Sequence, residues 1–301
     1  DFLSVQEALS GNTVFACLSD GMGAGEDQKL PVLMKYQHAD ALIKEMMSLC
    51  SEQISQLHTG SRTEGRGSVL LFESPAGGVG TTTLACACAY YLKHQGQKVL
   101  YLNLERFGVM ESFFSGDGKT DLGDLLYALK AKRGNFSLKL ESVVRQDISG
   151  ISYVEPCRHA ADTESISAKD MEVLVCAVVE SGMYDSVIMD RNSGVADTDY
   201  VLRNCADSVI LISDGTQTAN GKIQKLCEAL YLYEKNEDIV LMPKVKLLYN
   251  RFGSRTGCRL DQDQPETLGG FPRYEDMTER TIIEQMAEKE VFAGLCQREN
   301  R

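Results

Sequence analysis

The sequence contains no tryptophan, only four histidines and six prolines, and no uninterrupted apolar run long enough to cross a membrane. The histidines lie far apart, and no Cys-x-x-Cys or Cys/His cluster has the spacing of a metal site. The sequence therefore predicts neither a membrane-spanning helix nor a structural zinc centre. Ten cysteines are scattered irregularly, which is typical of buried small apolar side chains in a reducing compartment.

Positive charge is also scarce. Lys and Arg number 31 against 43 Asp and Glu, which gives a formal net charge of −12. This balance disfavours a bulk electrostatic grip on nucleic acid or anionic lipid. We therefore expect no nucleic-acid partner. The lack of a long apolar run predicts no direct membrane insertion, and the scattered cysteines predict a cytoplasmic location. The length of 301 residues and the apolar fraction of 43% suit one large globular domain with a smaller one.

A polar, glycine-rich stretch at residues 59–67 lacks apolar periodicity and is predicted to be a linker. It separates an N-terminal piece, residues 1–58, from a main domain, residues 68–301. The N-terminal piece has strand candidates at 13–18 and 31–34 and an amphipathic helix at 41–49. It is too short for a self-sufficient domain. We interpret it as the end of a flavodoxin-like module or as a small appendage on the main body.

Strands and helices alternate through the main domain. The strand candidates are residues 68–73, 98–104, 151–154, 186–190, 208–213 and 246–249, and the helix candidates are residues 82–95, 122–132, 168–181, 221–234 and 279–295. Several strands are nearly continuous apolar runs, which is typical of strands buried on both faces of a parallel sheet. The pattern predicts a doubly wound α/β fold with a mostly parallel sheet, whose ligands bind at the carboxyl edge of the strands.

A glycine-rich loop follows the first of these strands and runs directly into a helix, reading Ser74-Pro75-Ala76-Gly77-Gly78-Val79-Gly80-Thr81-Thr82-Thr83. Glycines permit close backbone approach, while the exposed N–H groups and the helix dipole attract phosphate. The residues predicted to hold the phosphates of a nucleotide are Gly77, Gly78, Val79, Gly80, Thr81, Thr82 and Thr83. The hydroxyl of Thr82, at the helix start, is placed to bind a Mg²⁺ ion on those phosphates.

The loop resembles that of the ParA/MinD superfamily of deviant Walker ATPases, P-loop NTPases of the SIMIBI type, which reads K-G-G-x-G-K-[ST]-[ST]. Ala76 stands at the signature lysine of that family and Thr81 at the common P-loop lysine, so both lysines are missing. The resemblance implies ATP and Mg²⁺ as ligands. It also implies that Glu105 matches the water-positioning catalytic acid and that Asp190, which closes a Walker-B-like strand, is the acid on the metal side.

The resemblance continues toward the C-terminus. Asn250 and Arg251 resemble the Asn-Arg segment that hydrogen-bonds the adenine base. The residues Gly269-Gly270-Phe271-Pro272 resemble the G-x-x-P turn beside the base, which implies that Pro272 contacts it.

The N-terminal piece carries a narrower resemblance. Residues 31–37, followed by an amphipathic helix, are similar to the tail of the atypical receiver domain in the TadZ/CpaE pilus-assembly group of this superfamily. That group helps to position type IVb (Flp/Tad) pilus machinery and tolerates phosphate loops without lysines. The resemblance implies an ATP-binding homodimer that recruits pilus-assembly proteins and is itself recruited by partners to the cell pole or the inner-membrane face.

The missing lysines predict that ATP hydrolysis is very slow or absent, because cationic groups stabilise the charge on a transferred phosphoryl group. Arg106 and Arg191, which follow strand ends carrying Glu105 and Asp190, are candidate substitute cations, although such arginines are more often paired with the neighbouring acids. Two other functions stay open: a nucleotide-independent interaction scaffold, and a ParA-like segregation ATPase, which the acidic charge disfavours. The C-terminal helix is expected to pack on the core, because its polar face is acidic or mixed.

Overall fold

The structure is a computed structural model of the chain that describes residues 16–20, 32–36, 42, 67–116, 120–130, 136–253, 257–260 and 265–296. In the N-terminal piece, β1 (Cys17–Ser19) and β2 (Val32–Met34) pair in parallel, near the two predicted strands. Apart from residue 42, which is helical, the helix expected at 41–49 lies outside the described residues, and so does the linker except for Gly67. The receiver-like character of this piece stays a prediction.

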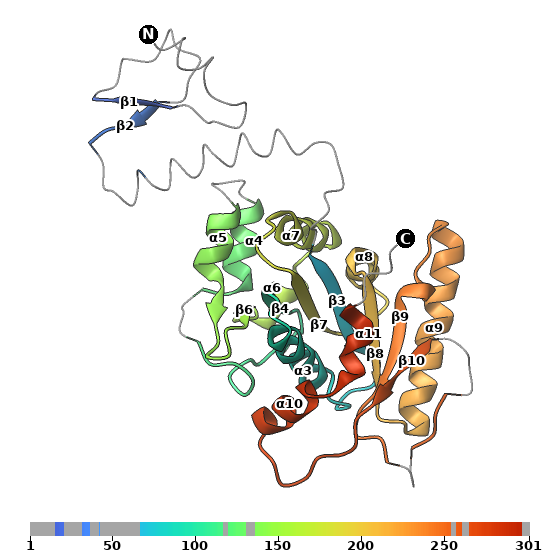
Figure 1. Cartoon of the computed structure of the whole chain (residues 1–301). Helices are drawn as coiled ribbons and strands as arrows, with labels where there is room; N and C mark the ends of the chain where they lie inside the picture. The colour runs from blue at the N-terminus through green and yellow to red at the C-terminus, as the bar shows by residue number, and fades with distance from the viewer. Residues whose placement is uncertain are drawn as a thin grey trace.

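An eight-stranded sheet forms the centre of the main domain, in the order β10-β9-β8-β3-β7-β4-β6-β5 (Figure 1). Its strands are β3 (Ser68–Ser74), β4 (Val99–Asn103), β5 (Arg145–Gln146), β6 (Ser152–Val154), β7 (Ser186–Asn192), β8 (Ser208–Ser213), β9 (Val245–Tyr249) and β10 (Glu266–Gly270). Within this sheet the short β5 is antiparallel to β6, and the other neighbours are parallel. The predicted α/β fold with a mostly parallel sheet is confirmed.

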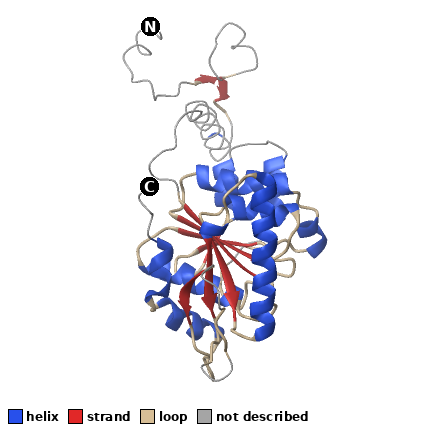
Figure 2. Ribbon diagram, turned by 90° about the vertical axis from the view of Figure 1, so that its right-hand side faces the viewer, coloured by secondary structure: helices blue, strands red, loops and turns tan. Residues whose placement is uncertain are grey.

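Helices cover both faces of the sheet (Figure 2). The helices are α3 (Thr81–His94), α4 (Leu122–Lys130), α5 (Phe136–Val143), α6 (Ala160–Glu164), α7 (Ala168–Glu180), α8 (Asp197–Cys205), α9 (Gln217–Glu237), α10 (Glu279–Ala287) and α11 (Ala293–Cys296), with 3-10 turns η1 (Met242–Lys244) and η2 (Glu290–Phe292). Alternate strand residues face opposite layers. Leu71 and Met189 pack toward α4, α5, α7, α8 and α9, whereas Leu70 and Ile188 pack toward α3, α10 and η2. This division is the doubly wound arrangement.

The C-terminal segment differs in part from the expectation. The single helix predicted at 279–295 is divided into α10, η2 and α11. Ile283, Met286 and Phe292 are buried on the α3 face of the sheet, so the expected core packing is confirmed. No helix among the described residues is long and apolar enough to cross a membrane.

The cysteines follow the expectation only in part. Cys86 and Cys88, in α3, and Cys227, in α9, are buried as expected. Cys176 and Cys258 are exposed, contrary to it. Their positions explain the difference, since Cys176 lies on the solvent side of α7 and Cys258 lies in the connection between β9 and β10.

Candidate functional site

The glycine-rich loop joins β3 to α3 at the carboxyl edge of the sheet (Figure 1). Because β3 lies between β7 and β8, the ends of three parallel strands meet beside the loop. The Ser74 hydroxyl donates a hydrogen bond to the Ile212 carbonyl at 2.7 Å and accepts one from the Ala76 N–H at 3.1 Å. These two bonds fix the first turn of the loop against β8.

The loop has free space over Gly77 and Gly78 and a close contact at Gly80. Gly78 and Gly80 have φ angles of 74° and 87°, in the left-handed region that favours glycine. A Cβ added to Gly77 or Gly78 would meet no atom within 4 Å. A Cβ on Gly80 would lie 2.3 Å from Nδ2 of Asn250. A ligand therefore has room over Gly77 and Gly78, while Gly80 is held close to Asn250.

The start of α3 completes an anion-binding arrangement. The helix begins at Thr81, has no acidic residue in its first turn, and no side chain caps its first N–H groups. Such N–H groups have no partner within the helix and carry partial positive charge. Thr81, Thr82 and Thr83 are half-buried there. The loop and this helix start thus present backbone donors of the kind that bind phosphate.

The two acids predicted from the sequence, Glu105 and Asp190, both lie near Thr82. Asp190 lies in β7 next to Asn103 of β4, and Glu105 follows that strand by two residues. Burial raises the pKa of both carboxyl groups, and the Thr82 side chain, which lies within reach of both, offsets part of that rise. Tyr101 donates a hydrogen bond to Oδ2 of Asp190 at 2.8 Å, while the buried Oδ1 makes no hydrogen bond. The floor of the site therefore contains an unsatisfied carboxylate oxygen.

Burial and mutual repulsion make this pair of acids unusual. Burial raises the pKa of Asp190 to about 7, and the nearby charge of Glu105 adds to the rise. Burial also raises the pKa of Glu105. A cation between the two groups would relieve the repulsion that otherwise favours a retained proton.

The residues around this pair fit Mg²⁺. A carboxylate oxygen without a partner, a second carboxylate and a hydroxyl are all oxygen donors, which Mg²⁺ prefers. No group of three or more His, Cys, Asp or Glu side chains is placed for metal binding in the part of the chain that the structure describes. Phosphate and water oxygens would therefore complete the coordination, as is usual when Mg²⁺ accompanies a nucleotide.

Asn250 and Arg251 reach the loop from the end of β9, two strands away from β3 in the sheet. Nδ2 of the buried Asn250 donates a hydrogen bond to the Val79 carbonyl at 2.8 Å, and its Oδ1 accepts the N–H of Arg251 at 3.0 Å. Nη1 of the exposed Arg251 donates to the Gly78 carbonyl at 3.0 Å. Both side chains therefore hold the glycine-rich loop, a role that their sequence motif does not indicate. Their contact with adenine stays a prediction.

The two arginines considered as substitute cations are paired elsewhere. Nε of Arg106 lies 2.6 Å from Oε1 of Glu164, and Nε of Arg191 lies 2.6 Å from Oδ1 of Asp199. Pairing was expected, but with the neighbouring acids Glu105 and Asp190, and that detail is wrong. The direction of these side chains explains it, because each arginine reaches an acidic side chain on a following helix.

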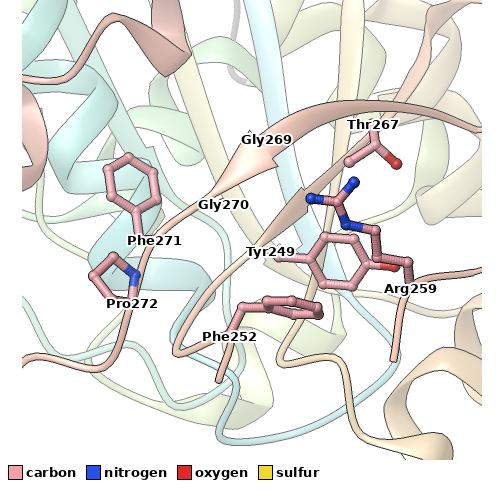
Figure 3. Close-up of a pocket in the computed structure, with 8 residues that line it drawn as sticks. All are labelled: Tyr249, Phe252, Arg259, Thr267, Gly269, Gly270, Phe271 and Pro272. Atoms are coloured by element: carbon pink, nitrogen blue, oxygen red, sulfur yellow. The ribbon is translucent and has the colours of Figure 1, made fainter. Parts of the chain in front are cut away.

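A cavity of about 280 Å³ opens at the carboxyl ends of β9 and β10 (Figure 3). It is lined by Tyr249, Phe252, Arg259, Thr267, Gly269, Gly270, Phe271 and Pro272. The rings of Tyr249 and Phe252 lie 4.9 Å apart on one side, and Figure 3 shows Pro272 on the other. Gly269 and Gly270 belong to β10 rather than to the turn that the motif predicted. The aromatic walls of this small cavity suit a planar group such as a nucleotide base.

A buried ion pair beside the loop was missed by the sequence reading. Nε and Nη2 of Arg203, in α8, donate to the two carboxylate oxygens of Glu73 at 2.8 and 2.9 Å. Nη2 also donates to the Gly194 carbonyl at 2.8 Å. The pair therefore connects the strand that enters the loop with the segment that follows β7. The sequence separation of 130 residues leaves no local signal for it.

Comparison with known proteins identifies solved structures with a similar fold. No family model matches the chain, and no curated protein matches its sequence. Among solved structures, a ParA family ATPase from Chlorobium tepidum TLS matches with a TM-score of 0.62 and 16% identity over 76% of this chain and 95% of its own. The MinC:MinD cell division protein complex of Aquifex aeolicus matches with a TM-score of 0.58 and 17% identity, over 77% of this chain and 97% of the matched chain.

The septum site-determining protein MinD from Pyrococcus horikoshii OT3, complexed with Mg-ADP, matches with a TM-score of 0.57 and 16% identity. The alignment covers 77% of this chain and 99% of that protein. At such low identities the similarity shows a shared fold rather than a shared role. The chain therefore has the α/β fold of the ParA/MinD-type P-loop ATPases.

Proposed function

We propose that the protein binds ATP with Mg²⁺ at the glycine-rich loop and uses the nucleotide to control its assembly rather than as a source of energy. One observation carries the proposal: an open loop and an uncapped helix start lie over a buried carboxylate whose Oδ1 lacks a partner. Phosphate suits the first two features and a divalent cation suits the third.

Each predicted site residue then has a task. The backbone N–H groups of residues 77–83 hold the phosphates, and Thr82 and Asp190 hold the metal. Bound Mg²⁺ would neutralise charge on the phosphates. Glu105, whose carboxyl group lies near Thr82, is placed to position a water molecule. The cavity beside Pro272 receives the base.

Binding is tested by calorimetric titration of the full chain with ATP, with Mg²⁺ and with EDTA. Thr82→Ala removes one hydroxyl ligand and is expected to weaken Mg-ATP binding by roughly 10-fold, because a hydrogen bond to a charged group contributes about 1.5–3 kcal/mol. The same exchange is expected to change ATP binding in EDTA much less, which serves as the internal control. A folded chain that binds no ATP at millimolar concentration would instead support the interaction scaffold.

We further propose that hydrolysis is very slow or absent. Loss of one charge that stabilises the transferred phosphoryl group commonly lowers the rate about 10³-fold or more. Here Ala76 and Thr81 replace two lysines, and Arg106 and Arg191 are occupied by other acids. Single-turnover phosphate release is expected near the background rate, and Thr81→Lys is expected to raise it. Wild-type turnover equal to that of Thr81→Lys would show that the lysine argument is wrong.

The finer biological role is positioning of type IVb (Flp/Tad) pilus machinery by a nucleotide-bound homodimer. Its support is the resemblance of residues 31–37 and the lysine-free loop to the TadZ/CpaE group. Sedimentation of the chain with ATP, with ADP and without nucleotide tests the dimer. Capture of the tagged chain from its native host tests the role, and pilus-assembly proteins are expected to be captured by the wild type more than by Thr82→Ala. Their absence from both captures would refute the pilus assignment.

A further inference from the structure

A phosphate loop without lysine leaves several negative charges of a bound polyphosphate to be balanced by other groups. Backbone N–H groups supply only partial charge. Among the residues that the structure describes, Arg251 is the cationic side chain that donates a hydrogen bond to the loop, from Nη1 to the Gly78 carbonyl at 3.0 Å. Its Nη2 lies 3.8 Å from the position that a Cβ on Gly80 would occupy. The guanidinium group therefore lies across the glycines of the loop.

The charge of Arg251 is available to a ligand. Three other arginines near the loop are neutralised by acids: Arg106 by Glu164, Arg191 by Asp199 and Arg203 by Glu73. Arg259 lines the cavity at the ends of β9 and β10, and no hydrogen bond joins it to the loop among the described residues. Within the described residues, Arg251 has no acidic partner, and its side chain is exposed. A guanidinium group carries five N–H donors in a planar fork that matches phosphate oxygens.

The backbone of Arg251 is held in the conformation that directs its side chain to the loop. Its φ of 54° lies in the left-handed region, which is unfavourable for a residue with a long side chain. Two hydrogen bonds maintain it: the N–H of Arg251 donates to Oδ1 of Asn250, and the N–H of Phe252 donates to the Phe271 carbonyl, both at 3.0 Å. Backbone strain that is maintained from both sides beside a binding loop is typical of a functional position.

We infer that Arg251 supplies the positive charge that the two lysine positions of the loop lack, and that its ligand is the phosphate chain of a nucleoside di- or triphosphate. The inference rests on the proposed function for the nucleotide, but the group recognised is the polyphosphate itself. It differs from the base contact that the Asn-Arg motif predicts. A base contact would weaken all adenine ligands equally when lost, whereas a phosphate contact weakens them according to their phosphate charge.

The test compares Arg251→Gln, which keeps an N–H donor but removes the charge, with Arg251→Lys, which keeps the charge. Full-length wild type and both variants are titrated with AMP, ADP, ATP and inorganic tripolyphosphate in Mg²⁺ buffer. Arg251→Gln is expected to weaken ADP, ATP and tripolyphosphate binding by about 10- to 100-fold and AMP binding less. Arg251→Lys keeps the charge but loses the planar fork, so it is expected to weaken binding less than Arg251→Gln. Arg106→Gln, an exposed arginine of the same sheet edge that is paired with Glu164, is the matched control and is expected to bind like the wild type.

The unfolding temperature of each variant is measured first, and unchanged values show that a loss of affinity is not a loss of fold. Equal weakening of AMP and ATP by Arg251→Gln would overturn the inference in favour of a base contact, and so would equal weakening by Arg251→Lys and Arg251→Gln. Wild-type binding of tripolyphosphate but not of ATP, with a loss in Arg251→Gln, would refute the proposed function and the nucleotide as ligand, but would support Arg251 as the cation that holds a polyphosphate. Wild-type binding of neither ligand would refute both.

Discussion

Exchange of Asp190 for asparagine separates charge from shape at the floor of the site. The side chain is completely buried, and burial with the charge of Glu105 raises its pKa to about 7. In the unfolded chain the carboxyl group has its ordinary pKa of 3.8. Between pH 4 and pH 7 the folded protein therefore binds more protons than the unfolded chain, and its stability falls as the pH rises through this window. Asparagine carries no titrating proton, so the variant lacks this fall.

The size of the effect follows from the shift. Each pKa unit corresponds to about 1.4 kcal/mol, so a rise from the ordinary 3.8 to about 7 corresponds to about 4 kcal/mol of stability lost above pH 7 without a metal. Two effects reduce the gain in stability that the variant shows. Glu105 takes part in the same titration, and the Tyr101 hydroxyl loses the carboxylate oxygen to which it donates a hydrogen bond. We therefore expect Asp190→Asn to be about 2 kcal/mol more stable than the wild type at pH 8 in EDTA.

Urea unfolding at pH 5 and pH 8 measures this difference. The wild type is expected to lose stability between the two pH values relative to Asp190→Asn, and Mg-ATP is expected to stabilise the wild type much more than the variant. Glu172→Gln, an exposed acid of α7, is the control and is expected to follow the wild type at both pH values. Parallel pH profiles of the wild type and Asp190→Asn would refute the reasoning, because they would mean that Asp190 titrates in the folded protein as it does in the unfolded chain.

Two further predictions concern the loop and the fold. Gly80→Ala is expected to abolish nucleotide binding and to lower the unfolding temperature, because its Cβ would lie 2.3 Å from Nδ2 of Asn250. Gly96→Ala, at a similar φ of 81° with open space around it, controls for backbone strain alone. An equal fall of the unfolding temperature in both variants would contradict the clash. Burial raises the pKa of Asp147, but the hydrogen bonds from Ser149 and Ser115 together outweigh it and lower the pKa to about 2. Asp147→Asn is therefore expected to lose about 2 kcal/mol at pH 7, and urea unfolding should show this difference vanish as the pH falls from 4 to 2.

The central layer of the fold was predictable because its signals are local. β3 and β8 are nearly continuous apolar runs, and burial on both faces of a parallel sheet requires such runs. The loop was predictable for the same reason, since glycines at fixed spacing between a strand and a helix have a backbone meaning that needs no distant partner. Glu105 and Asp190 were predicted from the family resemblance, and the structure places both near Thr82. The expected end of the strand at Asp190 is wrong, because β7 continues to Asn192.

The elements that the sequence reading missed are polar or marginal. α8 is a short, mostly polar helix with acidic residues in its first turn and Arg203 directed into the core, so its few apolar residues do not identify it as a helix. Its arginine is stabilised by Glu73, a partner that only the folded chain brings near. β10 is an exposed edge strand with two glycines, a composition that favours a turn. In both cases tertiary contacts override the local pattern.

The contacts of Asn250 and Arg251 with the loop could not be predicted from the sequence for a different reason. Their motif indicated a base contact, because a motif records residue types and order but not the direction of each side chain. The structure shows that both side chains hold the loop through the carbonyls of Val79 and Gly78. Such contacts across two strands depend on the order of strands in the sheet, which the sequence pattern did not predict.

The two positions that lack lysine are not equivalent in their surroundings. The side chain of Ala76 is 8% exposed and belongs, with Val79, to the apolar cluster beneath the loop. A lysine there would have to leave the core or carry its charge into it, and an unpaired buried charge is strongly unfavourable. Thr81 is half-buried at the start of α3, where a longer side chain has access to the ligand side. A lysine can therefore be introduced at residue 81 without disturbing this packing. A lysine at residue 76 requires the loop to repack, because the apolar core occupies the space that the side chain needs.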